Sequence, residues 1–338
     1  MKNLLYIGNN LSTAKTNVSS IQVLGSLLKS EGYDLRYASS YSNKFIRLLH
    51  MIWSCVFNSK WADAVIIDTY STQNFYYAYA CSKVCRLLKV PYFPILHGGN
   101  LPKRLDKNPK MSASIFNNSN MNISPSLYLK TIFNKKGFDN VSYIPNSISL
   151  DNYKVTPKQF DIIKLLWVRS FSEIYNPLMA ISVMKHLKDS GHRVELCMVG
   201  PDSDGSLIAV KTLAKELNMD VKFTGKLSKE QWIELSRDYN IFINTTNHDN
   251  MPVSVIEAMA LGFPVVSTNV GGLPFLIDNN ENGLLVPVKD IEAMAKSVLD
   301  IFNNEGIRNQ ISIKARQKAE SFNWQMTKAQ WHSIFKAN

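Results

Sequence analysis

The stretch 249–266 constrains this chain of 338 residues more than any other part of its sequence. It opens with Asp249 and Asn250, two residue types that cap helices well. The helix-forming run after Pro252 stops at Gly262, with Pro264 just beyond it. We therefore expect a helix that begins at Asp249 and Asn250 and ends at Gly262.

A buried strand over 264–268 and a tight loop at Gly271-Gly272 should follow this helix. The N-terminal amides of such a helix form an anion site that suits a diphosphate. Asp249 and Glu257 lie eight residues apart, one at the start of the predicted helix and one about a turn inside it. The stretch therefore predicts an anion site with two carboxylates close by.

The length and composition of the chain predict two domains in a reducing compartment. No run of 18 uninterrupted apolar residues occurs, so we expect no transmembrane helix. The first apolar run ends at Gly8, which indicates a strand and a loop and not a signal peptide. The four cysteines, Cys55, Cys81, Cys85 and Cys197, have the spacing of neither a disulfide scaffold nor a zinc site, and we interpret Cys81 and Cys85, at helical spacing, as core thiols.

Short apolar runs alternate with segments of helical periodicity along both halves of the chain, which is typical of open α/β sheets. In the first half we expect strands at 2–7, 64–68, 91–96, 123–126 and 143–148, and helices at 21–31 and 43–57. A linker at 150–161 should precede the strands at 162–168, 194–199, 241–245 and 283–286 and the helices at 291–301 and 324–335. Ligands of such sheets bind at the carboxyl ends of the strands.

The predicted helix 43–57 has two interpretations. It places six apolar residues on one face, with Lys44, Arg47 and His50 between them: Phe45, Leu48, Leu49, Ile52, Trp53 and Val56. The favoured interpretation is a helix that packs on the sheet. The other is an interfacial helix that dips into a bilayer.

The stretch 249–266 also resembles the nucleotide-sugar motif of retaining GT-B glycosyltransferases of the family-4 type, the glycosyl transferases group 1. That motif is Glu, seven residues, Glu, and then Ala-Met-Ala-x-Gly-x-Pro-Val-Val, which this chain matches from Glu257 to Val266. Asp249 stands where the family has its first Glu and is one methylene shorter. The likeness is strongest over 241–290.

The resemblance implies an α/β fold of two doubly wound Rossmann-like domains that face a central cleft. An N-terminal acceptor-side domain would span 1–152, and a C-terminal nucleotide-sugar-binding domain would span 160–320. A terminal helix within 322–338 would cross back to the first domain.

The resemblance also implies three catalytic residues. His97 would lie beside the donor sugar, Arg169 would bind the diphosphate of the donor, and Asp249 would orient the sugar. The family has a Lys five residues after this Arg, where this chain has Ile174. Tyr175 and Asn176, next in the chain, are candidate substitutes for this Lys.

Further contacts are implied on both sides of the reaction. Glu257 would hold the ribose hydroxyls, because a carboxylate accepts two hydrogen bonds. The full nucleotide-sugar set is Gly8, Gly225, Lys226, Asn250, Met251, Val253, Ser254 and Glu257. The acceptor-side set is Lys15, Thr16, Gly98, Gly99 and Asn146, with Lys15-Thr16 standing where the family often has Gly-Gly.

The pair Asp202 and Asp204 is similar to the metal site of another glycosyltransferase fold. Both lie in a loop bounded by Gly200, Pro201 and Gly205, so we interpret them as turn residues. We therefore predict no metal and no cofactor besides the nucleotide-sugar co-substrate.

The positive charge of the chain is concentrated in its first half. Residues 1–152 hold 17 Lys and Arg against 7 Asp and Glu, a net charge of +10 out of +11 for the whole chain. Such a surface favours an anionic membrane, a phosphorylated acceptor or nucleic acid, although a basic surface with no specific partner is also an ordinary outcome.

Taken together, the motif predicts a retaining, metal-independent transferase that moves a sugar from a UDP- or GDP-linked donor to a hydroxyl of a glycan or polyprenyl-diphosphate-linked acceptor. Bacterial surface polysaccharide synthesis is the expected setting, in the cytoplasm or at the inner face of the membrane. A sugar-nucleotide epimerase and a nucleic-acid-binding protein are the alternatives, and the latter would leave the motif unexplained. A dehydrogenase would need a Gly-x-Gly-x-x-Gly run after the first strand, which is absent at Gly8.

Overall fold

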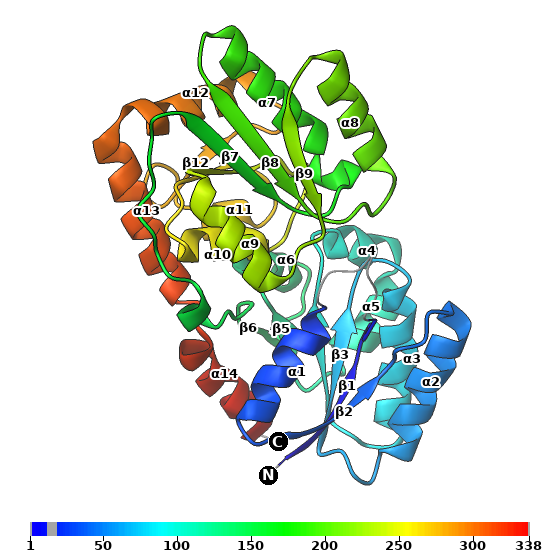
Figure 1. Cartoon of the computed structure of the whole chain (residues 1–338). Coiled ribbons are helices and arrows are strands. Elements are labelled where there is room, and N and C mark those ends of the chain that lie inside the picture. Colours follow the sequence, from blue (N-terminus) through cyan, green and yellow to red (C-terminus); the bar gives the residue numbers. More distant parts are fainter. Residues whose placement is uncertain (1, 12–18, 337–338) are drawn as a thin grey trace. The chain divides into compact units, whose positions relative to one another are not determined.

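The computed structural model of the protein describes residues 2–11 and 19–336. The chain divides into two compact units (Figure 1). The first contains Met1–Ser147 and Trp324–Asn338, and the second contains Ile148–Asn323. Lys15 and Thr16 lie outside the described residues.

The first unit is built on a parallel sheet with the strand order β2-β1-β3-β4-β5-β6. Its strands are β1 Asn3–Ile7, β2 Asp34–Ala38, β3 Ala64–Thr69, β4 Tyr92–Leu96, β5 Asn122–Ser124 and β6 Val141–Tyr143. Its helices are α1 Ser20–Ser30, α2 Lys44–Phe57, α3 Asn74–Leu87, α4 Leu101–Lys107, α5 Pro109–Phe116, α6 Leu127–Lys135 and α14 Trp324–Lys336. β3 and β4 are buried along their whole length, as expected for central parallel strands covered on both faces.

The second unit repeats this plan with the order β12-β11-β10-β7-β8-β9, again all parallel. Its strands are β7 Ile163–Val168, β8 Val194–Val199, β9 Val221–Gly225, β10 Ile241–Asn244, β11 Val265–Thr268 and β12 Leu284–Val286. Its helices are α7 Pro177–Asp189, α8 Ser206–Glu216, α9 Lys229–Leu235, α10 Val253–Ala260, α11 Leu273–Leu276, α12 Ile291–Asn303 and α13 Glu305–Glu320, with 3-10 turns η1 Leu150–Asn152, η2 Glu173–Tyr175 and η3 Ser236–Asp238.

The strand order of each sheet reverses once, between β1 and β3 in the first unit and between β7 and β10 in the second. Loops that leave such neighbouring strands diverge to opposite faces of the sheet and open a crevice at the carboxyl ends of the strands. Gly8 follows β1 and Asp68 lies near the end of β3, whereas Arg169 follows β7. The predicted α/β fold with two doubly wound sheets is therefore confirmed, and its reversal points mark where ligands are expected.

Three local predictions are corrected. α10 begins at Val253 with Pro252 at its N-cap and no side-chain cap, so Asp249 and Asn250 do not cap it. β6 ends at Tyr143 and does not continue to residue 148, where Pro145 offers no N–H for pairing. The sequence analysis also missed β2, which is an edge strand with mostly exposed side chains and no hydrophobic run.

α2 packs against α3 and β2, in line with the favoured interpretation of the helix 43–57, but through a different face from the one expected. α2 has the predicted bounds within one residue, but its apolar stripe is turned to solvent: Phe45, Leu49, Trp53 and Val56 are all at least half exposed. The face that packs against the unit holds Arg47, Met51, Ser54 and Cys55. Among the residues that the structure describes, no helix is long and apolar enough to cross a membrane.

The terminal helix α14 packs within the first unit. Trp324, Trp331 and Phe335 are buried in the same cluster as β1 and β4 side chains. Glu31 accepts a hydrogen bond from Trp324 Nε1 at 3.0 Å and pairs with Lys328 at 3.3 Å. Burial alone would raise the pKa of Glu31, but these hydrogen bonds lower it below its ordinary value.

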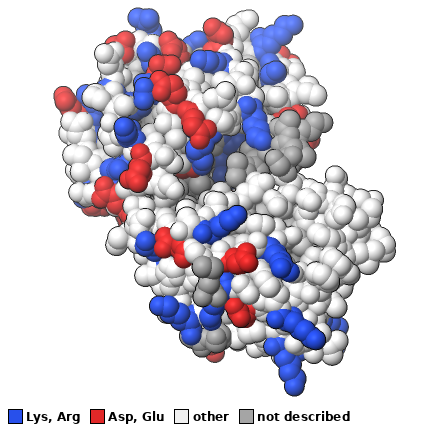
Figure 2. Space-filling model, turned by 60° about the horizontal axis from the view of Figure 1, so that its bottom comes forward, with Lys and Arg blue, Asp and Glu red and all other residues white. Residues whose placement is uncertain are grey.

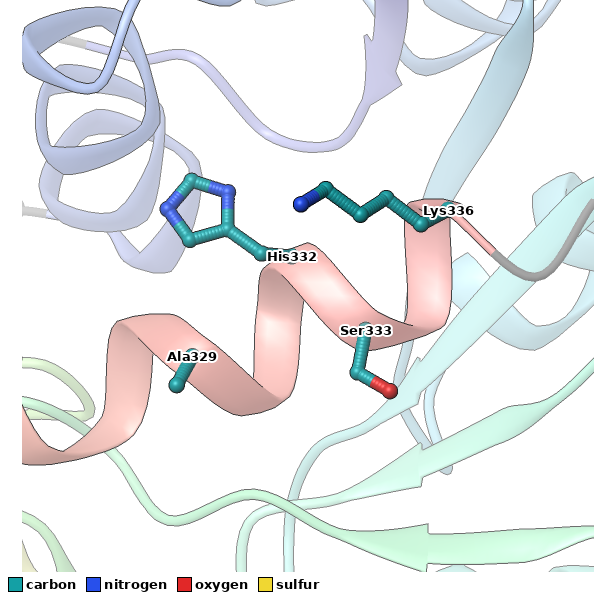
Figure 3. A pocket seen from close by; sticks show the side chains of 4 residues that line it. All are labelled: Ala329, His332, Ser333 and Lys336. Atoms are coloured by element: carbon teal, nitrogen blue, oxygen red, sulfur yellow. The ribbon is translucent and has the colours of Figure 1, made fainter.

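An open hollow of about 840 Å³ lies along α14 (Figure 3). The four residues that line it come from this one helix: Ala329, His332, Ser333 and Lys336. His332 Nδ1 lies 2.7 Å from the hydroxyl of Tyr33, so this ring is part of the attachment of α14. The hollow contains none of the residues that the sequence analysis assigned to the functional site.

Candidate nucleotide-sugar site

Arg169 is the first residue after β7, at the point where the strand order reverses. Its backbone N–H donates to Val199 O at 3.0 Å, which fixes its position at the end of the strand. The guanidinium forms an ion pair with Asp249 through Nη2, and its Cζ lies 3.9 Å from the ring centroid of Tyr175. The charge is therefore held between a carboxylate and an aromatic face.

Five buried polar atoms in Arg169, the end of β10, the loop after it and the start of α10 have no hydrogen-bond partner among the described residues: Arg169 Nε, Asn244 Oδ1, Asn247 Oδ1, His248 Nε2 and Ser254 Oγ. Arg169 follows β7, Asn244 ends β10, Asn247 and His248 lie in the loop after β10, and Ser254 lies in the first turn of α10. Each such atom left unpaired costs about 1–3 kcal/mol. Arg169 Nε and Ser254 Oγ can donate, as can His248 Nε2 when it carries the proton, so a ligand rich in acceptor oxygens would satisfy these three.

The start of α10 adds to this anion site. The first backbone amides of a helix have no partner within the helix, and the helix dipole makes its N-terminus electropositive. α10 begins at Val253, and Ser254 is the second residue of its first turn. The amides of Val253 and Ser254 thus belong to the first turn of α10, the helix at which the anion site is predicted.

The loop that leads into α10 is held by Gly271 and Gly272. A Cβ on Gly271 would overlap the backbone carbonyl of Asp249, and one on Gly272 would overlap that of Asn250. The backbone N–H of Gly272 donates to Asp249 O at 3.1 Å. The predicted tight loop therefore has a function in packing, because only glycine permits this approach of two backbones.

Glu257 lies one turn inside α10 and is only 4% exposed. The hydroxyl of Tyr153 donates to its Oε1 at 2.8 Å, and Lys229 forms an ion pair with the same oxygen. Burial and the nearby Glu257 charge raise the pKa of Tyr153 far above its ordinary value, so the phenol keeps its proton. Both donors reach Oε1, which leaves Oε2 for a ligand. The sequence analysis missed Tyr153 and Lys229, because nothing in their local sequence indicates that they contact α10.

We expect Glu257→Gln to weaken binding of a free nucleoside diphosphate about tenfold, the effect of losing one charged hydrogen bond of about 1.4 kcal/mol. Gln keeps the shape of the side chain but removes the charge. Isothermal titration with UDP measures the affinity, and a melting curve reports the loss of the Lys229 pair separately. Glu234→Gln, at an exposed carboxylate paired with Arg237, is the matched control. Equal affinity of both variants would remove Glu257 from the nucleotide site.

The predicted substitutes for the missing Lys do not supply a cation. Tyr175 packs its ring against Arg169, and Asn176 has a left-handed backbone conformation with φ of 46°. Ile174 itself accepts a hydrogen bond from Asn247 N through its carbonyl, at 2.8 Å. Tyr175 therefore orients Arg169, and Arg169 is the cation that this strand end provides.

The remaining predicted residues of the second unit lie nearby in the fold. Gly225 ends β9, and its carbonyl accepts from Gly200 N at 2.9 Å, which places Lys226 at the start of the next loop. Asn250 and Met251 are buried in the loop before α10. Asp202 accepts from Gly205 N, and Asp204 from Ser172 Oγ and Glu173 N, as expected of turn residues.

The first unit has its own polar cluster at the carboxyl ends of β1, β3 and β4. His97 Nε2 lies 2.8 Å from Asp68 Oδ1, the Tyr6 hydroxyl donates to the same oxygen at 3.0 Å, and all three side chains are buried. Burial, and then the adjacent Asp68, raises the pKa of Tyr6 well above its ordinary value. The contact with Asp68 orients the His97 ring, with Nε2 toward the carboxylate and Nδ1 on the other side of the ring.

Two glycines of the predicted set border this cluster. A Cβ on Gly8 would press against the carboxylate of Asp68, and Gly98 has a left-handed φ of 81°. Gly99 follows in the same turn, and Asn146 lies after the end of β6. Asp68 was missed as a site residue, although a carboxylate within an otherwise apolar buried strand is a signal that the sequence offered. The two clusters are thus assembled separately, one in each unit.

Comparison with known proteins agrees with the motif. Residues 153–318 match the family described as glycosyl transferases group 1. The matched residues all lie within the second unit, Ile148–Asn323. A D-inositol 3-phosphate glycosyltransferase of Saccharomonospora viridis is 28% identical over 47% of this chain and 40% of its own length. The amylovoran biosynthesis glycosyltransferase AmsK of Erwinia amylovora is 25% identical over 52% of this chain and 46% of its own.

The chain thus spans less than half the length of these curated relatives. A crystal structure of Anabaena Alr3699/HepE in complex with UDP and glucose covers all of both chains with a TM-score of 0.82 at 13% identity. This likeness confirms the predicted GT-B type of fold.

Proposed function

We propose that this protein transfers a glycosyl group from a nucleotide sugar to a hydroxyl of an acceptor. The observation that carries this proposal is the set of buried, unpaired polar atoms at Arg169, His248 and Ser254, with the buried carboxylate of Glu257 one turn further along α10. A nucleoside diphosphate offers acceptor oxygens to the first group and ribose hydroxyl donors to the carboxylate. Its chemistry therefore complements both parts.

The same residues account for the bond that breaks. When the glycosidic C–O bond of the donor cleaves, the electron pair leaves with the diphosphate, whose negative charge grows. Arg169 and the amides at the start of α10 are preorganised positive groups that stabilise this charge in the transition state. Asp249 holds Arg169 in place through their ion pair, and its carboxylate is the group we assign to orienting the sugar.

We infer a UDP- or GDP-linked donor, retention of configuration at the anomeric carbon, and no requirement for a metal ion. The structural relative binds UDP and glucose, which supports a donor of the UDP class. Arg169 and α10 supply positive charge at the predicted diphosphate position, and Asp202 and Asp204 are occupied by their own turn. His97, Gly98, Gly99 and Asn146 remain the proposed sugar and acceptor side.

The proposed acceptor is a glycan or a polyprenyl-diphosphate-linked glycan in bacterial surface polysaccharide synthesis. Relatives named for amylovoran and for capsular polysaccharide biosynthesis support this class. The net charge of +10 on residues 1–152 further supports peripheral association with an anionic surface, where such lipid-linked acceptors reside.

A screen of nucleotide sugars without any acceptor tests the reaction. We expect slow release of UDP or GDP from one donor, and this release should continue in excess EDTA because the leaving charge is stabilised by Arg169 and backbone amides. Chromatography of the products separates hydrolysis from epimerisation, which would return an isomeric nucleotide sugar. Activity that is lost in EDTA and restored by Mn²⁺ would refute the metal-independent mechanism, and no binding of any nucleotide sugar would refute the transferase itself.

A further inference from the structure

α2 of the first unit has its polarity reversed relative to an ordinary surface helix. Six large apolar side chains point to solvent, with exposures of 69% for Phe45, 65% for Phe57 and 56% for Trp53: Phe45, Ile46, Leu49, Trp53, Val56 and Phe57. They recur at intervals of three and four residues and so form one stripe along the helix. We call these six residues the α2 stripe.

Two polar residues of α2, Arg47 and Ser54, are turned inward together with Met51 and Cys55. Arg47 is buried and donates to Tyr41 O at 2.7 Å, to Asn9 Oδ1 at 3.0 Å and to Ser42 O at 3.0 Å. Ser54 is buried as well. Since Arg47 is fully used in fixing the helix to the unit, it cannot serve as a surface charge. α2 is therefore held in place by the hydrogen bonds of Arg47 and by the buried Met51 and Cys55, while the α2 stripe stays exposed.

The surroundings of the α2 stripe are basic. No Asp or Glu occurs between Asp34 and Asp63, whereas Lys44 and Lys60 flank the helix and both are exposed. Figure 2 shows a broad surface without charged side chains toward this side of the first unit, with Lys and Arg near its border. An exposed apolar patch with a basic rim matches the interior and the headgroups of an anionic bilayer.

We propose that α2 docks the protein on anionic lipid, with the α2 stripe inserted at the boundary between headgroups and acyl chains. Trp53 stacks on Phe57 with their ring centroids 4.7 Å apart, and aromatic side chains of this kind favour the membrane interface. Lys44 and Lys60 would contact the lipid phosphates at either end of the helix. This inference assigns a surface to the proposed anionic association, but it does not depend on transferase activity.

A second copy of this chain fits the α2 stripe less well. In a two-fold symmetric dimer the same patch faces itself, so the basic rim of one copy would lie against the basic rim of the other. Like charges in that arrangement repel, whereas an anionic bilayer neutralises them. The charge around the stripe thus favours lipid over self-association.

The test uses the full chain and its own fluorescence. Trp53 is the tryptophan with the largest exposure, while Trp167, Trp232, Trp324 and Trp331 are at most 5% exposed. Brominated phosphatidylglycerol vesicles should therefore quench mainly Trp53, and Trp53→Phe should remove most of the quenching. Trp61→Phe, which leaves the stripe intact, should retain it.

Partitioning into vesicles tests the surface itself. Phe45→Ser with Phe57→Ser should lower partitioning into phosphatidylglycerol vesicles about tenfold or more, because two apolar anchors are lost. The matched control is Ile208→Ser with Ile313→Ser, at side chains 72% and 60% exposed in the second unit, and it should partition like the parent. Phosphatidylcholine vesicles should retain the parent protein less, and rising salt should release it.

Other outcomes would overturn the proposal. Equal partitioning of the two double variants, or quenching that persists in Trp53→Phe, would each place the contact elsewhere. Equal binding to neutral vesicles would contradict the preference for anionic lipid. A dimer that dissociates in Phe45→Ser with Phe57→Ser, without vesicle binding by the parent, would assign the α2 stripe to a second copy. Donor hydrolysis does not enter these readouts, so failure here leaves the transferase proposal standing and the reverse also holds.

Discussion

Replacing Arg169 by Ala should lower kcat/KM for glycosyl transfer by roughly 30- to 150-fold, which corresponds to about 2–3 kcal/mol of transition-state stabilisation. The reason is the charge on the leaving diphosphate, which Arg169 meets with a guanidinium held by Asp249 and Tyr175. Because this charge is larger in the transition state than in the bound donor, the loss should fall mainly on kcat. Steady-state kinetics with a saturating acceptor measure it.

Two further variants separate this role from a structural one. Arg237→Ala removes an exposed arginine of the same unit that pairs with Glu234, and it should retain full activity. Arg169→Lys keeps the charge but loses the planar fork, so it should recover part of the activity. Turnover of Arg169→Ala within twofold of the parent, with an unchanged melting temperature, would assign the cation at the diphosphate to another residue.

Contacts within the protein fix the side chains of the candidate nucleotide-sugar site. Asp249 reaches Arg169 from a loop that Gly271 and Gly272 hold, and Glu257 is fixed by Tyr153 and Lys229. These supporting contacts come from parts of the second unit that are far apart in the sequence. The residues that would touch a donor are thus positioned before it binds, which lowers the cost of ordering them.

The sequence predicted most strands and the position of the anion site because both depend on local signals. The buried strands β3, β7 and β8 are short apolar runs, and the motif around Glu257 contains the helix, its stop at Gly262 and the following strand. β2 was not predicted, because an edge strand needs no apolar run. The start of α10 was misplaced because Asp249, a good capping residue, forms an ion pair with a residue 80 positions earlier.

The long-range partners could not be predicted for the same reason. Tyr153 contacts a carboxylate 104 residues later in the chain, and Asp68 contacts a histidine 29 residues later. The orientation of α2 was misjudged for a related reason. Its periodicity defines an apolar face, but only the tertiary packing of Arg47 and Ser54 decides that this face is turned outward.

Gly272→Ala should destabilise the second unit by about 3 kcal/mol, because a Cβ here overlaps the backbone carbonyl of Asn250 and backbone cannot move aside as a side-chain tip can. The φ of Gly272 is −87°, which alanine adopts freely, so the effect isolates this contact from backbone strain. We expect the melting temperature to fall by roughly 6–12 °C. Activity should fall as well, since relief of the overlap displaces the loop that carries Asp249 away from Arg169.

The matched control is Gly306→Ala in α13, where the nearest atom to a Cβ is Asn304 Oδ1 at 3.4 Å, and its stability should stay equal or rise slightly. Equal melting temperatures for the two variants would show that the loop tolerates a side chain at position 272 and that the site does not depend on this backbone approach.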